Sequence, residues 1–182
     1  NNLFIKERGK DEVLISSTMF QIPDERDKED ALAAVLISPD SEYLYFVSNN
    51  TIYGTQFQKF PTAETLLVSD MSSDIFSRPV DVSRFGIIFA GAQKNMGPAG
   101  VCVVAIRDDF LEMVPQDIPT MLKYSTFAAK NSMYNTPPCF AVYTVQLVLK
   151  WLEETMGGLE KMAAINQQKS NMLYGLIEGS GF

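Results

Sequence analysis

The chain has 182 residues, 46% of them apolar, which is enough to form the core of one ordinary globular domain. Its net charge of −7, without a basic stripe, argues against nucleic acid or an anionic membrane as the main partner. The chain has no histidine, which excludes catalytic triads with a histidine base and histidine-based metal sites. No zinc spacing is present either, so we expect no metal, and a lysine or carboxylate must do any acid–base work.

The first thirty residues are charged and lack the apolar core of a signal peptide. The longest apolar stretch, residues 140–149, is interrupted by Thr144 and Gln146 and is too short to span a bilayer. The sequence therefore predicts a soluble, cytoplasmic protein. In such a compartment Cys102 and Cys139 are predicted to be buried, reduced thiols.

Strand signals begin after a charge run at residues 24–30, which is typical of a solvated loop or the start of a helix. Four short apolar runs follow and show no alternation, as expected for strands buried on both faces. The predicted strands cover residues 43–48, 65–69, 86–90 and 100–106.

The C-terminal third changes to a helical period. A helix is predicted over residues 139–155, and Gly157-Gly158 ends it. Four large apolar residues share one face of this helix, and Trp151 is assigned to the core: Phe140, Tyr143, Leu147 and Trp151. A second helix is predicted over 159–177, with core positions at Leu159, Met162, Ile165, Leu173 and Leu176. Together the elements predict an α/β fold, a mostly parallel sheet flanked by helices.

Two ionisable residues follow the ends of predicted strands. Lys94 stands where an apolar run breaks into a Gly-rich loop, a placement that suits a desolvated amine. Burial favours the neutral form of an amine, which can form a Schiff base with an aldehyde. Asp70 ends another run 24 positions earlier, and a carboxylate there could face the ring nitrogen of pyridoxal phosphate. The plainer alternatives are a surface lysine and an aspartate that caps the next turn.

Other polar residues in loops could bind the same cofactor. Gln93 could donate to a phosphate oxygen, and Thr51 could bond a ring hydroxyl. Asn135 and Thr136 precede a predicted helix and could supply donors to a phosphate. Taken alone, each is more often an ordinary loop or capping residue.

Four segments together carry a family resemblance: residues 48–55 (SNNTIYGT), 69–82 (SDMSSDIFSRPVDV), 91–100 (GAQKNMGPAG) and 132–138 (SMYNTPP). With them the chain resembles the phosphoserine aminotransferases, which are class V, fold type I enzymes dependent on pyridoxal phosphate. The match runs from about residue 43 to the C-terminus. We therefore divide the chain into a poorly matched segment, 1–42, and a segment of the aminotransferase large domain, 43–182.

The resemblance implies a role for each matching residue. Lys94 would be the cofactor-bonding lysine and proton carrier, and Asp70 the partner of the ring nitrogen. Thr51 would bond the ring's phenolic oxygen, and Gln93 would hold the phosphate. Asn135 and Thr136 would reach the phosphate in the neighbouring subunit, so the resemblance implies a homodimer with a shared active site.

The implied reaction exchanges an amino group between O-phospho-L-serine and 2-oxoglutarate in serine biosynthesis. The family's other phosphate-binding, ring-stacking and substrate-binding residues fall outside the matched part, so we expect the chain to be a fragment of a longer enzyme. Two alternatives stay open: another class V enzyme, such as a cysteine desulfurase, and a non-catalytic homologue that only dimerises.

Overall fold

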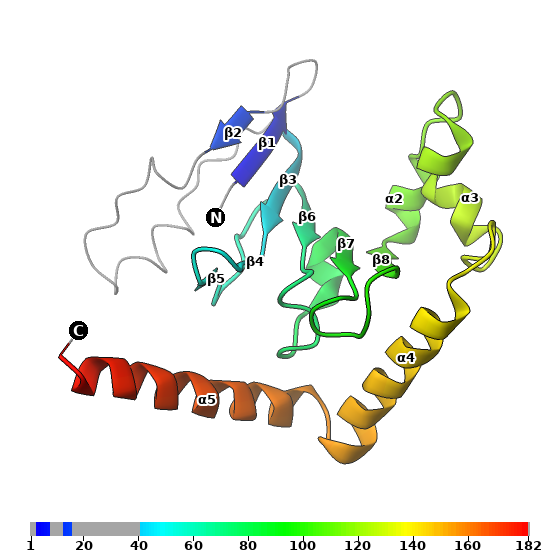
Figure 1. Ribbon diagram of the computed structural model, residues 1–182. Coiled ribbons are helices and arrows are strands. Elements are labelled where there is room, and N and C mark those ends of the chain that lie inside the picture. The colour runs from blue at the N-terminus through cyan, green and yellow to red at the C-terminus, as the bar shows by residue number, and fades with distance from the viewer. Residues whose placement is uncertain (1–2, 8–12, 16–40, 182) are drawn as a thin grey trace.

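The structure is a computed structural model that describes residues 3–7, 13–15 and 41–181; the charge run at 24–30 lies outside these ranges. Six strands form one sheet in the order β2-β1-β3-β6-β7-β8 (Figure 1). Their bounds are β1 Leu3–Glu7, β2 Val13–Ile15, β3 Ser41–Val47, β6 Leu66–Asp70, β7 Phe85–Gly91 and β8 Cys102–Ile106. A separate two-stranded hairpin consists of β4 (Asn49–Asn50) and β5 (Thr55–Gln56).

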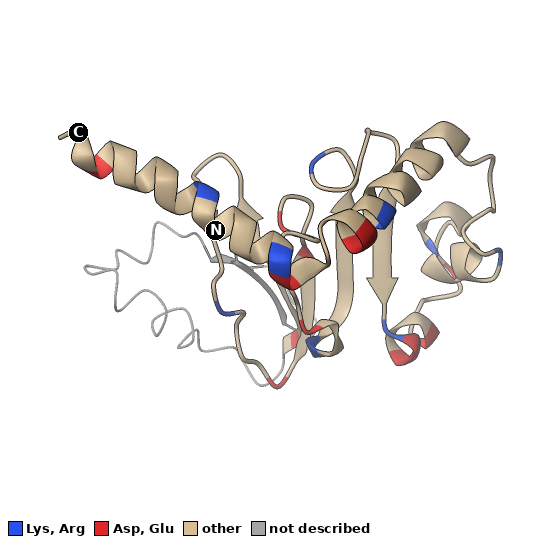
Figure 2. Ribbon diagram, turned by 90° about the horizontal axis from the view of Figure 1, so that it is seen from below, with Lys and Arg blue, Asp and Glu red and all other residues tan. Residues whose placement is uncertain are grey.

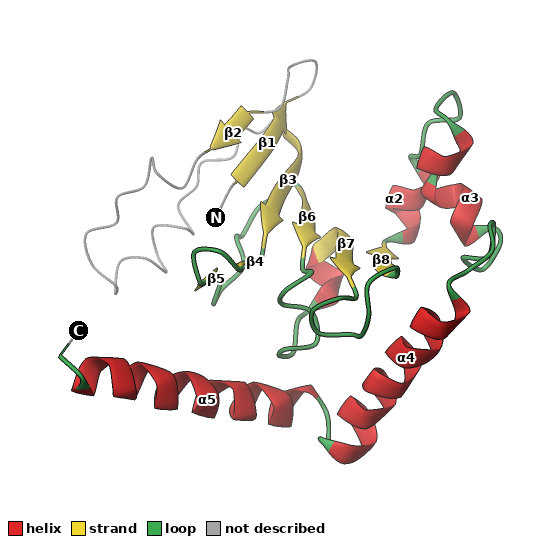
Figure 3. Ribbon diagram, viewed as in Figure 1, coloured by secondary structure: helices red, strands yellow, loops and turns green. Residues whose placement is uncertain are grey.

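The centre of the sheet is parallel and its margins are antiparallel. Strand β6 pairs in parallel with both β3 and β7, whereas β1 and β8 run antiparallel to their neighbours β3 and β7. Since β2 is antiparallel to β1, four of the six strands (β2, β3, β6 and β7) point the same way. The sheet is thus mixed but mostly parallel, with flanking helices (Figure 3), and the predicted α/β class is confirmed.

The four predicted strands correspond to β3, β6, β7 and β8, with ends displaced by one or two residues. Burial on both faces is wrong for β8, the last strand of the sheet order among the described residues, because none of its residues is fully buried. Cys102, its first residue, is exposed. Cys139 is exposed too, so the prediction of two buried thiols is also wrong.

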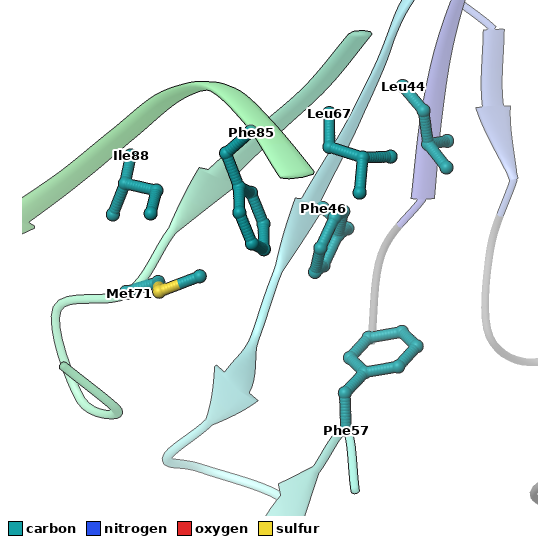
Figure 4. Close-up of a cluster of buried hydrophobic side chains, with 7 residues drawn as sticks. All are labelled: Leu44, Phe46, Phe57, Leu67, Met71, Phe85 and Ile88. Carbon is teal, nitrogen blue, oxygen red and sulfur yellow. The ribbon is translucent and has the colours of Figure 1, made fainter. Parts of the chain in front are cut away.

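The main core lies between the central strands and the segments that follow them. Phe46 on β3 is fully buried, and its ring lies 5.3 Å from that of Phe57 and 6.1 Å from that of Phe85, centroid to centroid. Burying one such ring stabilises the fold by about 1.5–3 kcal/mol. Figure 4 shows the whole cluster: Leu44, Phe46, Phe57, Leu67, Met71, Phe85 and Ile88.

Both long helices lie where the sequence predicts them. Helix α4 (Cys139–Lys150) continues into the π-helical turn η4 (Trp151–Thr155), and α5 spans Leu159–Gly179. Gly157 and Gly158 separate them with φ values of 78° and 94°, in the left-handed region that side chains rarely adopt. The short elements are η2 Val82–Arg84, α2 Asp108–Glu112, η3 Thr120–Leu122 and α3 Tyr124–Ala128. In the part of the chain that the structure describes, no helix is both long and apolar enough to cross a membrane.

The predicted core face of α4 is wrong. Its four large apolar residues, Phe140, Tyr143, Leu147 and Trp151, are all exposed. The helix instead buries Ala141 and Val145, and Val145 packs against Ala90 and Met96 at the end of β7. Small and β-branched side chains on this side let the helix approach the sheet closely.

In α5 the predicted core positions are only partly confirmed. Leu159, Met162 and Ile165 are half-buried, whereas Leu173 and Leu176 are exposed. Figure 2 shows few charged residues along this helix. The large apolar residues in its second half, among them Leu173 and Leu176, are exposed, and no described residue covers them.

Candidate active site

The first pair of predicted site residues meets at one end of the sheet. Lys94 lies in a tight turn after β7, in which the carbonyl of Ala92 accepts hydrogen bonds from the N–H groups of Met96 and Gly97. Its Nζ donates to Oγ1 of Thr51 across 2.7 Å. Thr51 stands at the tip of the β4–β5 hairpin, 43 positions earlier in the chain. The fold therefore brings together two residues that the sequence could only place at strand ends.

The prediction that burial desolvates the amine of Lys94 is wrong for the described residues. Its side chain is exposed, and among those residues Thr51 is its only hydrogen-bond partner. The other contacts of this turn, from the amide of Asn95 to the carbonyl of Ile75 and from Met96 to the cluster around Val145, leave the side chain of Lys94 uncovered.

Asp70 is the last residue of β6 and lies beside Phe89 of β7 in the register of the sheet. Its Oδ1 accepts a hydrogen bond from the backbone N–H of Ser72 at 2.8 Å, so the capping alternative is realised. The other oxygen, Oδ2, has no hydrogen-bond partner among the described residues. One carboxylate can thus cap the turn and still accept a bond from a ligand.

Ser72 is a connecting residue that the sequence analysis missed. Its Oγ accepts a hydrogen bond from the N–H of Gly91 at 3.0 Å, which joins the turn after β6 to the end of β7. The signal was available, because a serine two positions after a strand-ending aspartate is typical of a side-chain-capped turn.

Gln93 is exposed and its amide folds back over Gly91. A Cβ added to Gly91 would lie only 2.5 Å from Oε1 of Gln93, so the glycine leaves the space that this amide occupies. The amide therefore lies near the turn that contains Asp70 and Ser72, where a ligand's polar group could bond it.

The structure does not bring Asn135 and Thr136 to the same place. Both are exposed in the loop between α3 and α4, which Figure 1 shows apart from the turn after β7. The amide of Asn135 donates only to the carbonyl of Thr136, at 3.3 Å, among the contacts of the described chain. Within one chain these two residues belong to a different surface from Lys94.

A buried ion pair beside the site also escaped the sequence analysis. Asp74 is completely buried, and its Oδ2 lies 3.1 Å from Nη2 of Arg78. The four-residue spacing of these opposite charges was visible in the sequence. Their further hydrogen bonds, from Gln56 to Asp74 and from Arg78 to Phe57, could not be predicted because they join residues some 20 positions apart. Their contacts are taken up below.

Comparison with known proteins identifies the class. The sequence profile of the aminotransferase class-V family matches residues 18–182, and the chain belongs to this family. It is 61% identical over 147 residues to the phosphoserine aminotransferase of Desulfatibacillum aliphaticivorans and 55% identical over 142 residues to that of Geobacillus kaustophilus. These alignments cover 80% and 78% of this chain but only 41% and 39% of the relatives. The chain thus spans about two fifths of their length.

Solved structures agree with the sequence matches. Phosphoserine aminotransferase from Bacillus circulans subsp. alkalophilus is 49% identical, with a TM-score of 0.76 over 80% of this chain and 40% of that one. The pyridoxal-phosphate-bound enzyme from Trichomonas vaginalis is 45% identical, with a TM-score of 0.72 over 76% of this chain and 41% of that one. The resemblance stated from the four sequence segments is confirmed.

Proposed function

We propose that the chain is the large-domain segment, residues 43–182, of a phosphoserine aminotransferase. The proposed reaction exchanges the amino group between O-phospho-L-serine and 2-oxoglutarate, giving 3-phosphohydroxypyruvate and glutamate for serine biosynthesis. The observation that carries the proposal is the contact between Lys94 and Thr51 at the edge of the sheet where β6 ends in Asp70, in a chain 61% identical to a protein of that name.

The residues present fit pyridoxal phosphate. Asp70 has a free carboxylate oxygen at the carboxyl end of a parallel strand, which is where ligands bind in such sheets. The amine of Lys94 is exposed and has no carboxylate partner in the described chain, so it is free to react. Thr51, which bonds that amine, and Gln93, whose amide lies over Gly91, supply neutral hydrogen-bonding groups. We assign Lys94, Asp70, Thr51 and Gln93 to this cofactor.

Pyridoxal phosphate, when bound, supplies an aldehyde that bonds to amines and a ring that draws electrons from the carbon next to the substrate's nitrogen. The protein's own residues do the rest. Asp70 keeps a proton on the ring nitrogen by its negative charge. Lys94, once its neutral amine is free, takes a proton from the substrate's α-carbon and returns one as general base and acid. The hydroxyl of Thr51 fixes where that amine lies.

The proposal includes a homodimer. Asn135 and Thr136 are exposed donors with no contact to Lys94 in their own chain, which fits residues that serve the active site of a second subunit. A cytoplasmic location, which the sequence analysis predicts, belongs to the same proposal.

The test uses the natural protein that contains these residues. Wild type, Lys94→Ala and a matched control, Lys150→Ala, are loaded with pyridoxal phosphate. Lys150 is exposed on α4 and pairs with Glu154, so its loss removes an equal charge away from the site. We expect a visible absorption band and glutamate formation from phosphoserine in wild type and the control, and neither in Lys94→Ala.

The other outcomes decide between the alternatives. A band without glutamate formation, together with formation of alanine from cysteine and release of the sulfur as sulfide by an added thiol reductant, would assign the chain to a cysteine desulfurase instead. No band in wild type would leave only a non-catalytic homologue. For the shared site, mixing inactive Lys94→Ala with inactive Asn135→Ala subunits should restore activity, because one of the two sites in a mixed dimer is intact. No recovery would contradict the proposal that Asn135 serves the active site of the neighbouring subunit.

A further inference from the structure

Among the described residues, Asp74 is a fully buried charged group that the proposed mechanism does not use, and it pairs with the partly buried Arg78. The carboxylate of Asp74 is 0% exposed, and three side chains donate to it. Ser77 Oγ and Arg78 Nη2 come from its own loop, at 2.9 and 3.1 Å. The third donor comes from another element, the amide of Gln56 on β5, at 2.6 Å.

Arg78 extends the same connection. Its Nη2 donates to the carbonyl of Phe57 at 2.6 Å, and Nη1 donates to the carbonyl of Gln58 at 3.3 Å. Its guanidinium also lies 5.0 Å from the ring centre of Phe60. The guanidinium nitrogens form a rigid planar fork. By bonding both Asp74 and the carbonyl of Phe57, this fork fixes the distance between the loop that follows β6 and the chain that follows β5.

All these contacts hold the base of the β4–β5 hairpin. Ser73 adds one more, with Oγ donating to the carbonyl of Asn49 at 2.9 Å. The tip, in contrast, is exposed: Ile52 is 89% exposed, and among the described residues the side chain of Asn50 accepts bonds only from the N–H groups of Ile52 and Tyr53 within the tip itself. The direction in which the tip points, and so the place of Thr51, is therefore set at the base.

We propose that Asp74 and Arg78 are positioning residues that hold the hairpin so that Thr51 meets the amine of Lys94. The effect on the cofactor rests on the proposed function, whereas the clamp on the hairpin does not. Neither residue touches Lys94; both act through Thr51.

The first experiment measures the clamp without the cofactor. Hydrogen–deuterium exchange is followed in peptides covering residues 48–58 and 85–91 of the apo form of the natural protein. Arg78→Gln should speed exchange in 48–58 and leave 85–91 unchanged. The matched control is Arg84→Gln: Arg84 also bonds backbone carbonyls, those of Phe60 and Pro61, but not the hairpin or Asp74. Unchanged exchange in 48–58, or equal acceleration by Arg84→Gln, would overturn the proposal.

The second experiment asks whether the effect passes through Thr51. Affinity for pyridoxal phosphate should fall about tenfold in Arg78→Gln, the factor for one lost well-placed hydrogen bond. In a Thr51→Val background the same substitution should cause no further loss, since the group it positions is already gone. An equal further loss would show that Arg78 acts by another route and would overturn the positioning role.

A milder variant protects the test against misfolding. Arg78→Lys keeps the charge beside Asp74 but loses the fork, so it should speed exchange in 48–58 less than Arg78→Gln does and still spare 85–91. If Arg78→Lys matches wild type in both exchange and cofactor affinity, the fork is not needed and the proposal is wrong. If wild type binds no pyridoxal phosphate at all, the proposed function fails, while the exchange experiment still decides whether the clamp exists.

Discussion

Asp70 has a structural role and a proposed chemical one, and two substitutions separate them. Asp70→Asn keeps an oxygen that can accept the N–H of Ser72 but removes the charge. Asp70→Ala removes both. If the carboxylate serves the ring nitrogen of the cofactor, the two variants should differ in stability but not in activity.

The first effect follows from the geometry of the turn, and the second from a general estimate for charge pairs. Loss of the capping bond at 2.8 Å should lower the free energy of unfolding of Asp70→Ala by about 1 kcal/mol, whereas Asp70→Asn should stay within about 0.5 kcal/mol of wild type. Two opposite charges about 4 Å apart near a protein surface attract each other by about 4 kcal/mol. Loss of this attraction should therefore lower kcat about 1000-fold in both variants.

Urea denaturation and glutamate formation from phosphoserine measure the two quantities in the same preparations. The reasoning is refuted if Asp70→Asn keeps kcat within tenfold of wild type while Asp70→Ala loses stability as predicted. Asp70 would then be a turn cap only.

Three further predictions follow. Phe46→Ala should lower the free energy of unfolding by about 3–5 kcal/mol, because Phe46 is fully buried against three rings; in the same urea experiment Ile52→Ala at the exposed hairpin tip should change it by less than about 0.5 kcal/mol. Gly91→Ala should leave the free energy of unfolding nearly unchanged, because only the flexible end of Gln93 must move. It should weaken pyridoxal phosphate binding as much as Gln93→Ala does, since both changes displace the same amide. If the losses of affinity add up in the double variant, this explanation is contradicted. Hydrogen bonds from Ser83, chiefly from its hydroxyl and secondly from its N–H, hold the pKa of Asp81 below its ordinary 3.8. The ionised carboxylate therefore stabilises the fold above about pH 4, and this stabilisation is lost as the pH falls through the lower pKa of the folded state. Ser83→Ala should raise that pKa toward 3.8 in a carboxyl-carbon NMR titration, and an unchanged value would show that the hydroxyl is not the cause.

The sequence predicted the elements and strand-end positions better than the contacts between them. Lys94 and Asp70 could be placed because apolar runs end there and the carboxyl ends of parallel strands meet at one edge of a sheet. The bond from Lys94 to Thr51 could not be predicted, because it depends on the direction of a hairpin that Gln56 and Phe57 anchor to a loop some 20 residues later.

The errors have a common physical origin. Helical period shows that apolar residues lie on one side of α4, but it does not show which side packs on this part of the chain, and Val145 rather than Trp151 meets the sheet. Similarly, an apolar run such as 100–106 predicts a strand but not whether other parts of the chain cover both of its faces, and no residue of β8 is fully buried.

The most direct test of the central claim is to find where pyridoxal phosphate attaches. The natural protein is incubated with the cofactor, reduced with borohydride, digested and mapped by peptide mass spectrometry. The account predicts the cofactor mass on the peptide that contains Lys94 and on no other. Attachment to a different lysine, or to none, would contradict the assignment of this site.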